Sequence, residues 1–207
     1  MNGPRMLNEK EKSGRAAAIV LGIVSVLLIV FFCFVLWLNM WHFGVQVSGS
    51  SMYDTLKDGD YVYASRYFDL ARGDIIIIDV SDYREEDGLS GDYLVKRLIA
   101  TEGDSVYCRD GVVYRKDAEG SEFYALDESY ITGETSDFDQ LTVGEDEIFF
   151  LGDNRPVSKD SRVLGCYLES DVVGVVPSWA VAIKDITGGW ERFVSFFTGR
   201  SASSMTR

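Results

Sequence analysis

Histidine is nearly absent from this sequence: among 207 residues the only one is His42. A serine nucleophile is usually activated by a histidine that takes its proton. His42, however, follows Trp37 and Trp41 at the end of a long apolar run, where amphipathic aromatic side chains typically anchor a membrane helix at the interface. A Ser-His-Asp triad is therefore not expected.

Cysteine is scarce as well, and Cys33, Cys108 and Cys166 show no C-x-x-C spacing. The sequence therefore predicts no metal site and no cofactor. Cys33 lies inside the apolar run. A disulfide between Cys108 and Cys166 would be compatible with an extracytoplasmic compartment, but the spacing does not show that the two thiols meet, so the pairing stays open at this point.

Basic residues are outnumbered: the chain has 20 Lys and Arg against 33 Asp and Glu. Four of the basic and two of the acidic residues precede the apolar run, so the part that follows it carries a net charge of −15. A nucleic-acid partner would need a basic surface, and this class of function is excluded. The acidity is typical of a domain that stays soluble outside the cell.

One segment, residues 16–38, contains 23 positions without a charge. At about 1.5 Å per residue, a helix of this length spans the ~30 Å hydrocarbon layer. A cleaved secretory signal, the alternative, has an apolar core of about 7–15 residues and a small-residue cleavage site. The sequence thus predicts one uncleaved transmembrane helix. Because residues 1–15 are basic, they are expected in the cytoplasm of a cell-membrane protein that crosses the bilayer once.

Residues 39–186 are predicted to form one extracytoplasmic, mainly β, antiparallel domain. Short segments rich in β-branched and aromatic residues alternate with Gly and Asp. These segments are 45–48, 61–66, 74–80, 93–100, 147–153 and 172–176. Asp110 and Gly111 predict a two-residue hairpin turn. The charged stretches 81–92 and 132–147 predict exposed loops.

The C-terminal residues, 187–207, read as an amphipathic and then disordered tail. Trp190, Phe193, Val194 and Phe197 follow the i, i+3, i+4, i+7 spacing of one helix face. Two interpretations stay open: this face closes the core, or it lies on the membrane surface. The polar end after it is expected to be disordered.

Two serines, Ser50 and Ser51, stand in the stretch GSSMYDTL at 49–56. Without a histidine, their base would be a lysine whose pKa burial lowers from about 10.4. In the strand 93–100, alternation places Lys96 on one face between Leu94 and Leu98. The alternative is that Lys96 only lays its methylenes on apolar surface and keeps its ammonium in water. The strand alone does not decide between the two.

Three ordered segments, together with the anchor before them, resemble the type I signal peptidases, membrane-anchored serine proteases that remove signal peptides from exported proteins. The segments are S-M-x-x-T-L at 51–56, K-R followed by G-D at 96–104, and G-D-N-R-x-x-S-x-D-S-R at 152–162; RGDIIII from Arg72 is a weaker match. The compact form with one anchor is similar to the Gram-positive members. The resemblance implies an antiparallel β fold with a coiled or barrel-like core.

The resemblance also implies the roles of the reacting groups. Ser51 would be the nucleophile and Lys96 the general base, forming and then hydrolysing an acyl-enzyme. The backbone N–H of Ser51 would stabilise the oxyanion. A second donor stays open, because the position two before the nucleophile, a serine in some members, is Gly49 here; Ser50 could replace it, or one donor suffices.

In the distal loop, the resemblance makes Ser158 the hydroxyl that hydrogen-bonds the lysine amine. Asp160 and Arg162 would form an ion pair that fixes this loop near the site; without the resemblance, they read as an ordinary surface pair. Two departures from the family pattern concern loop stiffness: Asp54 stands where a proline is usual, and Glu102 lies in IATEGD where IGLPGD is usual.

The implied substrates are signal-peptide-bearing precursors with small residues, typically Ala, at positions one and three before the cut, bound as an extended strand. Membrane phospholipid is an implied partner, and the site would lie near the export translocon. Two alternatives remain. A self-cleaving repressor-type Ser/Lys peptidase would be soluble and bind DNA. A non-cleaving scaffold for surface structures would tolerate loss of Ser51 or Lys96.

Overall fold

The computed structural model describes residues 3–83, 86–89, 91–186 and 189. The chain divides into two compact units, Met1–Trp41 and His42–Arg207. The first is the helix α1, Gly3–Trp41, whose stretch Ser13–Trp37 is long and apolar enough to cross a membrane and is not buried by any other part of the protein. The predicted span 16–38 therefore lies within one continuous helix. Apart from Gly189, the predicted tail 187–207 falls outside the described residues.

The second unit consists of two antiparallel sheets. The larger sheet has the strand order β1-β2-β11-β3-β4-β9-β10, and the smaller has the order β7-β6-β5-β8. The strands of the larger sheet are β1 (His42–Gln46), β2 (Tyr61–Ser65), β3 (Ile75–Asp79), β4 (Tyr93–Thr101), β9 (Glu147–Leu151), β10 (Tyr167–Leu168) and β11 (Val172–Val176). Those of the smaller sheet are β5 (Ser105–Arg109), β6 (Val112–Lys116), β7 (Tyr124–Ala125) and β8 (Phe138–Thr142).

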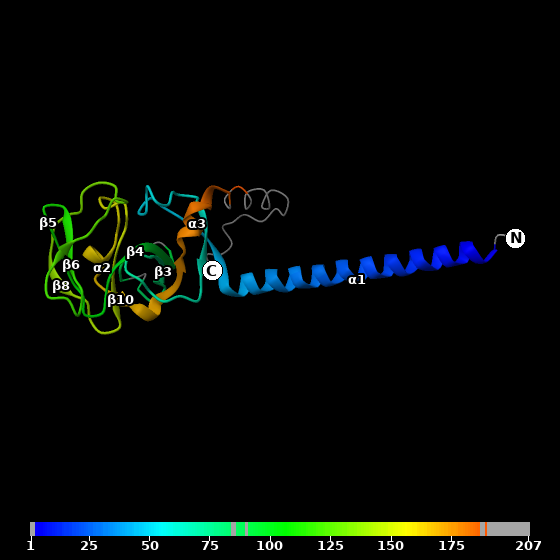
Figure 1. The fold of residues 1–207 in the computed structure, drawn as a ribbon. Coiled ribbons are helices and arrows are strands. Elements are labelled where there is room, and N and C mark those ends of the chain that lie inside the picture. The colour runs from blue at the N-terminus through cyan, green and yellow to red at the C-terminus, as the bar shows by residue number, and fades with distance from the viewer. Residues whose placement is uncertain (1–2, 84–85, 90, 187–188, 190–207) are drawn as a thin grey trace. The chain divides into compact units, whose positions relative to one another are not determined.

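Three short helical segments complete the second unit. They are α2 (Ser161–Leu164), the 3-10 helix η1 (Glu169–Asp171) and α3 (Ser178–Ala182). In Figure 1 the smaller sheet lies at one end of the unit and α3 at the other. The larger sheet curls into a half-barrel, so the predicted mainly β, antiparallel class is confirmed.

Most predicted strands occur where the alternation of residues places them. The hairpin turn also forms: Asp110 and Gly111 both have positive φ, 52° and 79°, and they join β5 to β6. This backbone pair is the one that a two-residue hairpin favours, because its twist matches that of the strands. The free cysteines Cys108 and Cys166 form no disulfide.

The larger sheet carries the core that positions the site. β3 is the sequence run Ile75 to Ile78, and its side chains are buried on both faces of the sheet. Ile75 and Ile77 face the first core cluster, whereas Ile76 and Ile78 face the second. A strand covered on both sides reads as a continuous apolar run.

Each buried cluster draws on several elements. The first core cluster contains Val47, Met52, Leu56, Val62, Ala64, Ile75, Ile77, Val176 and Ala180. The second contains Ile76, Ile78, Val80, Leu98, Ile148, Phe150, Tyr167, Val172 and Val175. The third, under the smaller sheet, contains Ile99, Ala100, Val106, Cys108, Val113, Val143, Phe149 and Leu151.

The two predicted loops differ from expectation. Residues 132–147 contain the strand β8, where Phe138 and Leu141 pack against the third core cluster while Asp139 and Gln140 stay exposed. The loop prediction was wrong here because a strand at a sheet edge buries only part of its side chains and so looks polar. In the loop 81–92, Tyr83 and Leu89 pack against the second core cluster, so this loop is not fully exposed.

Candidate active site

Ser51 stands on a tight turn between β1 and β2. The Leu56 N–H donates to the Met52 carbonyl at 2.8 Å, and both side chains are fully buried in the first core cluster. Before the turn, Gly49 has φ +90° and its N–H donates to Asp58 Oδ1 at 2.8 Å. Two buried apolar side chains thus hold the turn against the sheet and leave Ser51 half-buried at its start.

Lys96 comes from the middle of β4, where it pairs with Ile76 of β3. Its residue surface is only 2% exposed, and its Nζ donates to Ser51 Oγ at 2.6 Å. The alternation of the strand, which placed Lys96 on an apolar face, agrees with this burial. The structure therefore brings together the two residues, 45 positions apart, to which the sequence assigned the chemistry.

Burial lowers the pKa of Lys96 from 10.5 to about 8, because an ammonium loses hydration when it leaves water. The negative charges of Asp160 and Asp153 oppose this shift, and the positive charge of Arg162 adds to it. A lysine with such a pKa is partly neutral near physiological pH. It can accept a proton from a hydroxyl within hydrogen-bond distance.

The backbone at the nucleophile leaves one donor available. Among the described residues, no acceptor bonds the Ser51 backbone N–H. The Gly49 N–H, in contrast, is bound to Asp58, and Gly49 has no side chain to offer. Of the two residues considered for a second oxyanion donor, only Ser50 therefore has a hydroxyl.

The pair Asp160 and Arg162 lies where the loop that follows β9 enters α2. Arg162 Nε contacts Asp160 Oδ1 at 2.8 Å and its Nη2 contacts Oδ2 at 2.9 Å, with side chains 8% and 0% exposed. Asp160 Oδ2 also accepts the Gly152 N–H at 3.0 Å. The ion pair is thus buried and ties both ends of the loop together, unlike an ordinary surface pair.

Ser158 differs from expectation. Its Oγ is buried and makes no hydrogen bond with any described residue, so the expected bond to the Lys96 amine is not formed. Lys96 Nζ bonds Ser51 Oγ instead. Ser158 nevertheless lies beside the nucleophile: a Cβ on Gly152 would come within 2.2 Å of Ser158 Oγ and 2.6 Å of the Ser51 carbonyl.

Two residues of the quoted motifs have a contact that sequence reasoning missed. Arg97 Nε donates to Asp153 Oδ1 at 2.8 Å and its Nη2 to Oδ2 at 2.6 Å. Asp153 is fully buried and also accepts the Thr55 hydroxyl. The available signal was the presence of Arg97 and Asp153 in the K-R and G-D-N-R motifs, which placed a charge of each sign next to the site.

Among the free cysteines, Cys108 is buried and Cys166 is half-buried. Burial raises the pKa of Cys108 and of Cys166 to about 11, so both thiols stay protonated. Within the described ranges, no group of three or more His, Cys, Asp and Glu residues is placed to hold a metal ion. The candidate reactive groups that the structure brings together at this site are the Ser51 hydroxyl and the Lys96 amine.

The sequence is similar to known signal peptidases. The family described as "Signal peptidase, peptidase S26" matches residues 17–180. "Signal peptidase I T" of Bacillus subtilis (strain 168) is 34% identical over 167 residues, 76% of this chain and 79% of the relative. "Signal peptidase I" of Bacillus licheniformis is 37% identical over 155 residues, covering 70% and 75%. A "Signal peptidase I" of Bacillus amyloliquefaciens is 30% identical over 181 residues, covering 82% and 91%.

Proposed function

The chain belongs to the signal peptidase family, peptidase S26, and is a serine peptidase; on this basis we propose that it removes signal peptides from exported precursors through a Ser51/Lys96 dyad at the membrane. One observation carries the proposal: the 2.6 Å contact between Ser51 Oγ and the amine of a lysine that is 2% exposed. A serine nucleophile that has no histidine beside it needs another base. A buried lysine in contact with the hydroxyl, with its pKa lowered to about 8, can take that role.

The reaction would proceed by acyl transfer. Neutral Lys96 takes the Ser51 hydroxyl proton while Oγ attacks the scissile carbonyl carbon. The oxygen of the scissile carbonyl becomes negative and accepts a hydrogen bond from the free Ser51 N–H. Lys96 then gives its proton to the leaving amine, which departs as the new N-terminus of the mature protein. A water molecule, deprotonated by Lys96, hydrolyses the serine ester and releases the signal peptide.

The proposed location follows from the apolar span of α1 and the charges that precede this span. Residues 1–15 carry Arg5, Lys10, Lys12 and Arg15, which favours a cytoplasmic N-terminus, a single crossing by residues 16–38 and an extracytoplasmic domain over residues 39–186. Exposed Trp179, Ile183 and Ile186 in and after α3 offer an apolar surface to phospholipid. Precursors would arrive from a nearby export translocon.

The test is cleavage of a precursor whose signal peptide ends in Ala-x-Ala by the full chain in detergent. We expect Ser51→Ala and Lys96→Ala each to lower kcat/KM by about 10³-fold or more, because the dyad acts as one unit. Ser170→Ala and Lys116→Ala, which change the same residue types away from the site, are the matched controls. Full activity of Ser51→Ala would contradict the proposed chemistry and favour a scaffold.

A further inference from the structure

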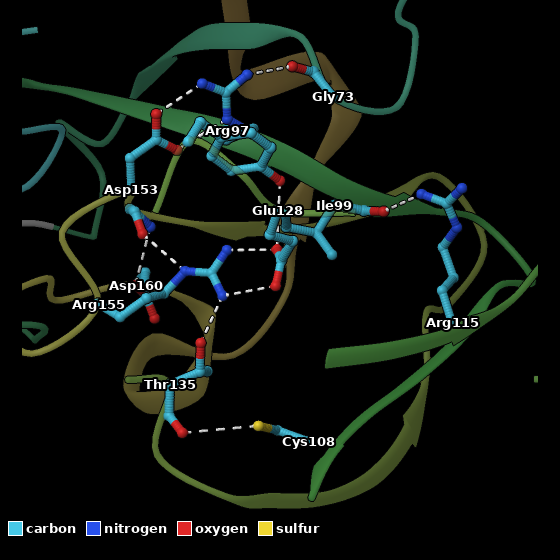
Figure 2. Close-up of polar contacts among 12 residues, drawn as sticks. Gly73, Arg97, Ile99, Cys108, Arg115, Glu128, Thr135, Asp153, Arg155 and Asp160 are labelled. Atoms are coloured by element: carbon cyan, nitrogen blue, oxygen red, sulfur yellow. Dashed lines mark hydrogen bonds and ion pairs between the residues drawn. The ribbon is translucent and has the colours of Figure 1, made fainter. Parts of the chain in front are cut away.

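The segment 128–135 has no role in the chemistry above, yet it holds a buried charged pair beside the site. The Arg155 side chain is fully buried, and that of Glu128 is 7% exposed. Arg155 Nη1 donates to Glu128 Oε2 at 3.0 Å and to Thr135 Oγ1 at 2.6 Å, its Nη2 donates to Glu128 Oε1, and its Nε donates to the Gly152 carbonyl at 3.0 Å. Figure 2 shows the guanidinium pointing toward Glu128 and Thr135.

This pair is joined to the neighbouring ion pair of the site. The Tyr130 ring lies 3.9 Å from the Arg97 guanidinium, and its hydroxyl donates to Glu128 Oε1 at 3.2 Å. Arg97 in turn binds Asp153. Burial and then the Glu128 charge raise the pKa of Tyr130, so its phenol stays protonated and remains a donor to Glu128.

The backbone of the same segment runs beside the motif loop. The Thr132 N–H donates to the Asp153 carbonyl at 2.8 Å, and the Arg155 N–H donates to the Thr132 carbonyl at 3.1 Å. Asn154 lies between these two bonds. Its position is therefore determined on both sides by the segment that carries Glu128.

Asn154 makes two bonds to the nucleophile turn. Its backbone N–H donates to the Ser51 carbonyl at 2.9 Å, and its side-chain Nδ2 donates to the Ser50 carbonyl at 3.0 Å. The Tyr53 N–H also donates to the Ser50 carbonyl, at 3.2 Å, but it belongs to the turn itself. Asn154 thus fixes the Ser50 and Ser51 carbonyls from outside the turn.

The bond to Ser50 has a specific geometric consequence. The peptide bond between Ser50 and Ser51 is trans, so the Ser50 carbonyl and the Ser51 N–H lie in one plane and point in opposite directions. A donor that fixes the Ser50 carbonyl therefore also fixes the direction of the Ser51 N–H. This N–H is the group proposed above to stabilise the oxyanion, and such donors act well only when they are oriented before the reaction.

We propose that Asn154 is a positioning residue for the oxyanion donor: its side-chain amide orients the Ser50–Ser51 peptide, and the Glu128–Arg155 pair holds Asn154 in place. The inference rests on the proposed function, since it concerns the same nucleophile. It assigns to Glu128, outside every quoted motif, a part in the reaction that acts through Arg155 and Asn154.

The decisive variant is Asn154→Ala, which removes the bond to Ser50 and keeps the backbone bond to Ser51. We expect kcat to fall about 10- to 100-fold, with KM, melting temperature and the midpoint of the pH profile unchanged, because binding and the Lys96 base are untouched. A signal peptide ending in a boronate, which places a tetrahedral anion on Ser51, should bind more weakly by a similar factor. Gln140→Ala, which removes an exposed side-chain amide in β8, is the control.

The second variant, Glu128→Gln, keeps the shape of the side chain and removes its charge. We expect a smaller fall in kcat of the same kind, with Glu134→Gln in the same segment as the control. Unchanged kcat and boronate affinity in Asn154→Ala would overturn the proposal. A loss of stability in Glu128→Gln with unchanged kcat would overturn the part assigned to Glu128.

The two proposals fail in different ways. If the wild-type chain cleaves no precursor, the proposed function fails. If the wild type cleaves and Ser51→Ala does not, while Asn154→Ala cleaves at the wild-type rate, only the role of Asn154 fails. A variant Asn154→Ser, whose shorter hydroxyl side chain does not reach the position of Nδ2, provides the same test if the alanine variant does not fold.

Discussion

At the scale of single residues, Lys96 shows how burial creates reactivity. An exposed lysine is almost fully charged at neutral pH and has no lone pair to accept a proton. Here the side chain is buried beside Ser51, and the loss of hydration outweighs the attraction of Asp160 and Asp153. The residue is therefore a candidate base because of where β4 places it.

The pH dependence of the reaction follows from this pKa. Since the base must be neutral, kcat/KM should fall about tenfold per pH unit below the Lys96 pKa of about 8 and level off above it. Asp160→Asn removes a charge that raises this pKa, so the profile should move to lower pH in that variant. Cleavage rates measured from pH 5 to 10 test both; a flat wild-type profile would contradict a lysine base.

Gly152 is a second residue to consider, because the atoms around it leave no room for a side chain. A Cβ there would lie 2.2 Å from Ser158 Oγ and 2.6 Å from the Ser51 carbonyl oxygen, too close for either to remain in place. We expect Gly152→Ala to lower kcat/KM by about 10²-fold, since small displacements at a nucleophile are costly. Gly91→Ala, where the nearest atom is 3.8 Å away, is the control. Equal activity of the two variants would show that the turn can yield.

At the scale of elements, β4 is held in its middle and just beyond its C-terminal end. The Arg97 guanidinium binds Asp153 in its middle, and a fully buried carboxylate, Asp104, lies just beyond its C-terminal end. Asp104 accepts two bonds from Arg72, at 2.6 and 2.7 Å, and the N–H groups of Thr101 and Ala118. The strand that carries Lys96 is therefore fixed to the loops on either side of it.

Asp104 should contribute stability that depends on pH. Burial alone would raise its pKa, but the hydrogen bonds from Arg72 and the Thr101 N–H outweigh burial and lower it. A carboxyl with a lowered pKa stabilises the folded state above about pH 4 and loses this effect as the pH falls through the folded value. Asp104→Ala should reduce the free energy of unfolding by about 2–4 kcal/mol, because buried N–H groups lose their acceptor.

Denaturant unfolding at pH 7 and at pH 3 measures this contribution. The difference between the wild type and Asp104→Ala should be large at pH 7 and smaller at pH 3, where the carboxyl begins to gain its proton. Asp139→Ala, an exposed carboxylate in β8, is the control and should change little at either pH. A difference that grows at pH 3 would contradict the assigned direction of the pKa.

Local sequence pattern predicts elements well and the contacts between them poorly. β3 was predictable because it is a short, continuous β-branched run, and β4 because its residues alternate with the period of a strand. β8 was missed because Asp139 and Gln140 give it the composition of a loop. The Asn154 amide and the Ser50 carbonyl are 104 positions apart, and nothing local specifies that they meet.

The site shows the same division. Ser51 and Lys96 could be named as candidate nucleophile and base through the resemblance to signal peptidases, whereas the pattern of the strand alone left the role of Lys96 open. The direction of a hydroxyl could not be predicted. Ser158 lies beside the site, yet its Oγ makes no hydrogen bond with any described residue. Which of several nearby donors reaches the Lys96 amine depends on packing to a fraction of an ångström, which no spacing encodes.

At the scale of the whole molecule, the chain combines two units with opposite solvent preferences. Helix α1 exposes large apolar side chains between Ile19 and Trp37, whereas the three core clusters of the second unit are built only from residues after 42. Exposed apolar surface on that scale is costly in water and favourable in a bilayer. The second unit has a core of its own and carries both Ser51 and Lys96.

This division leads to a test of anchoring and orientation. The full chain should pellet with membranes and resist carbonate extraction. Protease added to intact cells should digest the second unit, because the proposed orientation places residues 1–15 in the cytoplasm. A chain lacking residues 1–41 should be released, keep cleaving short soluble peptides and lose most activity on membrane-inserted precursors.

If that shortened chain still bound vesicles, and Trp179→Ala with Ile183→Ala released it, the α3 surface would be a second membrane contact. Release of the full chain from membranes by carbonate would contradict the prediction that α1 anchors the protein.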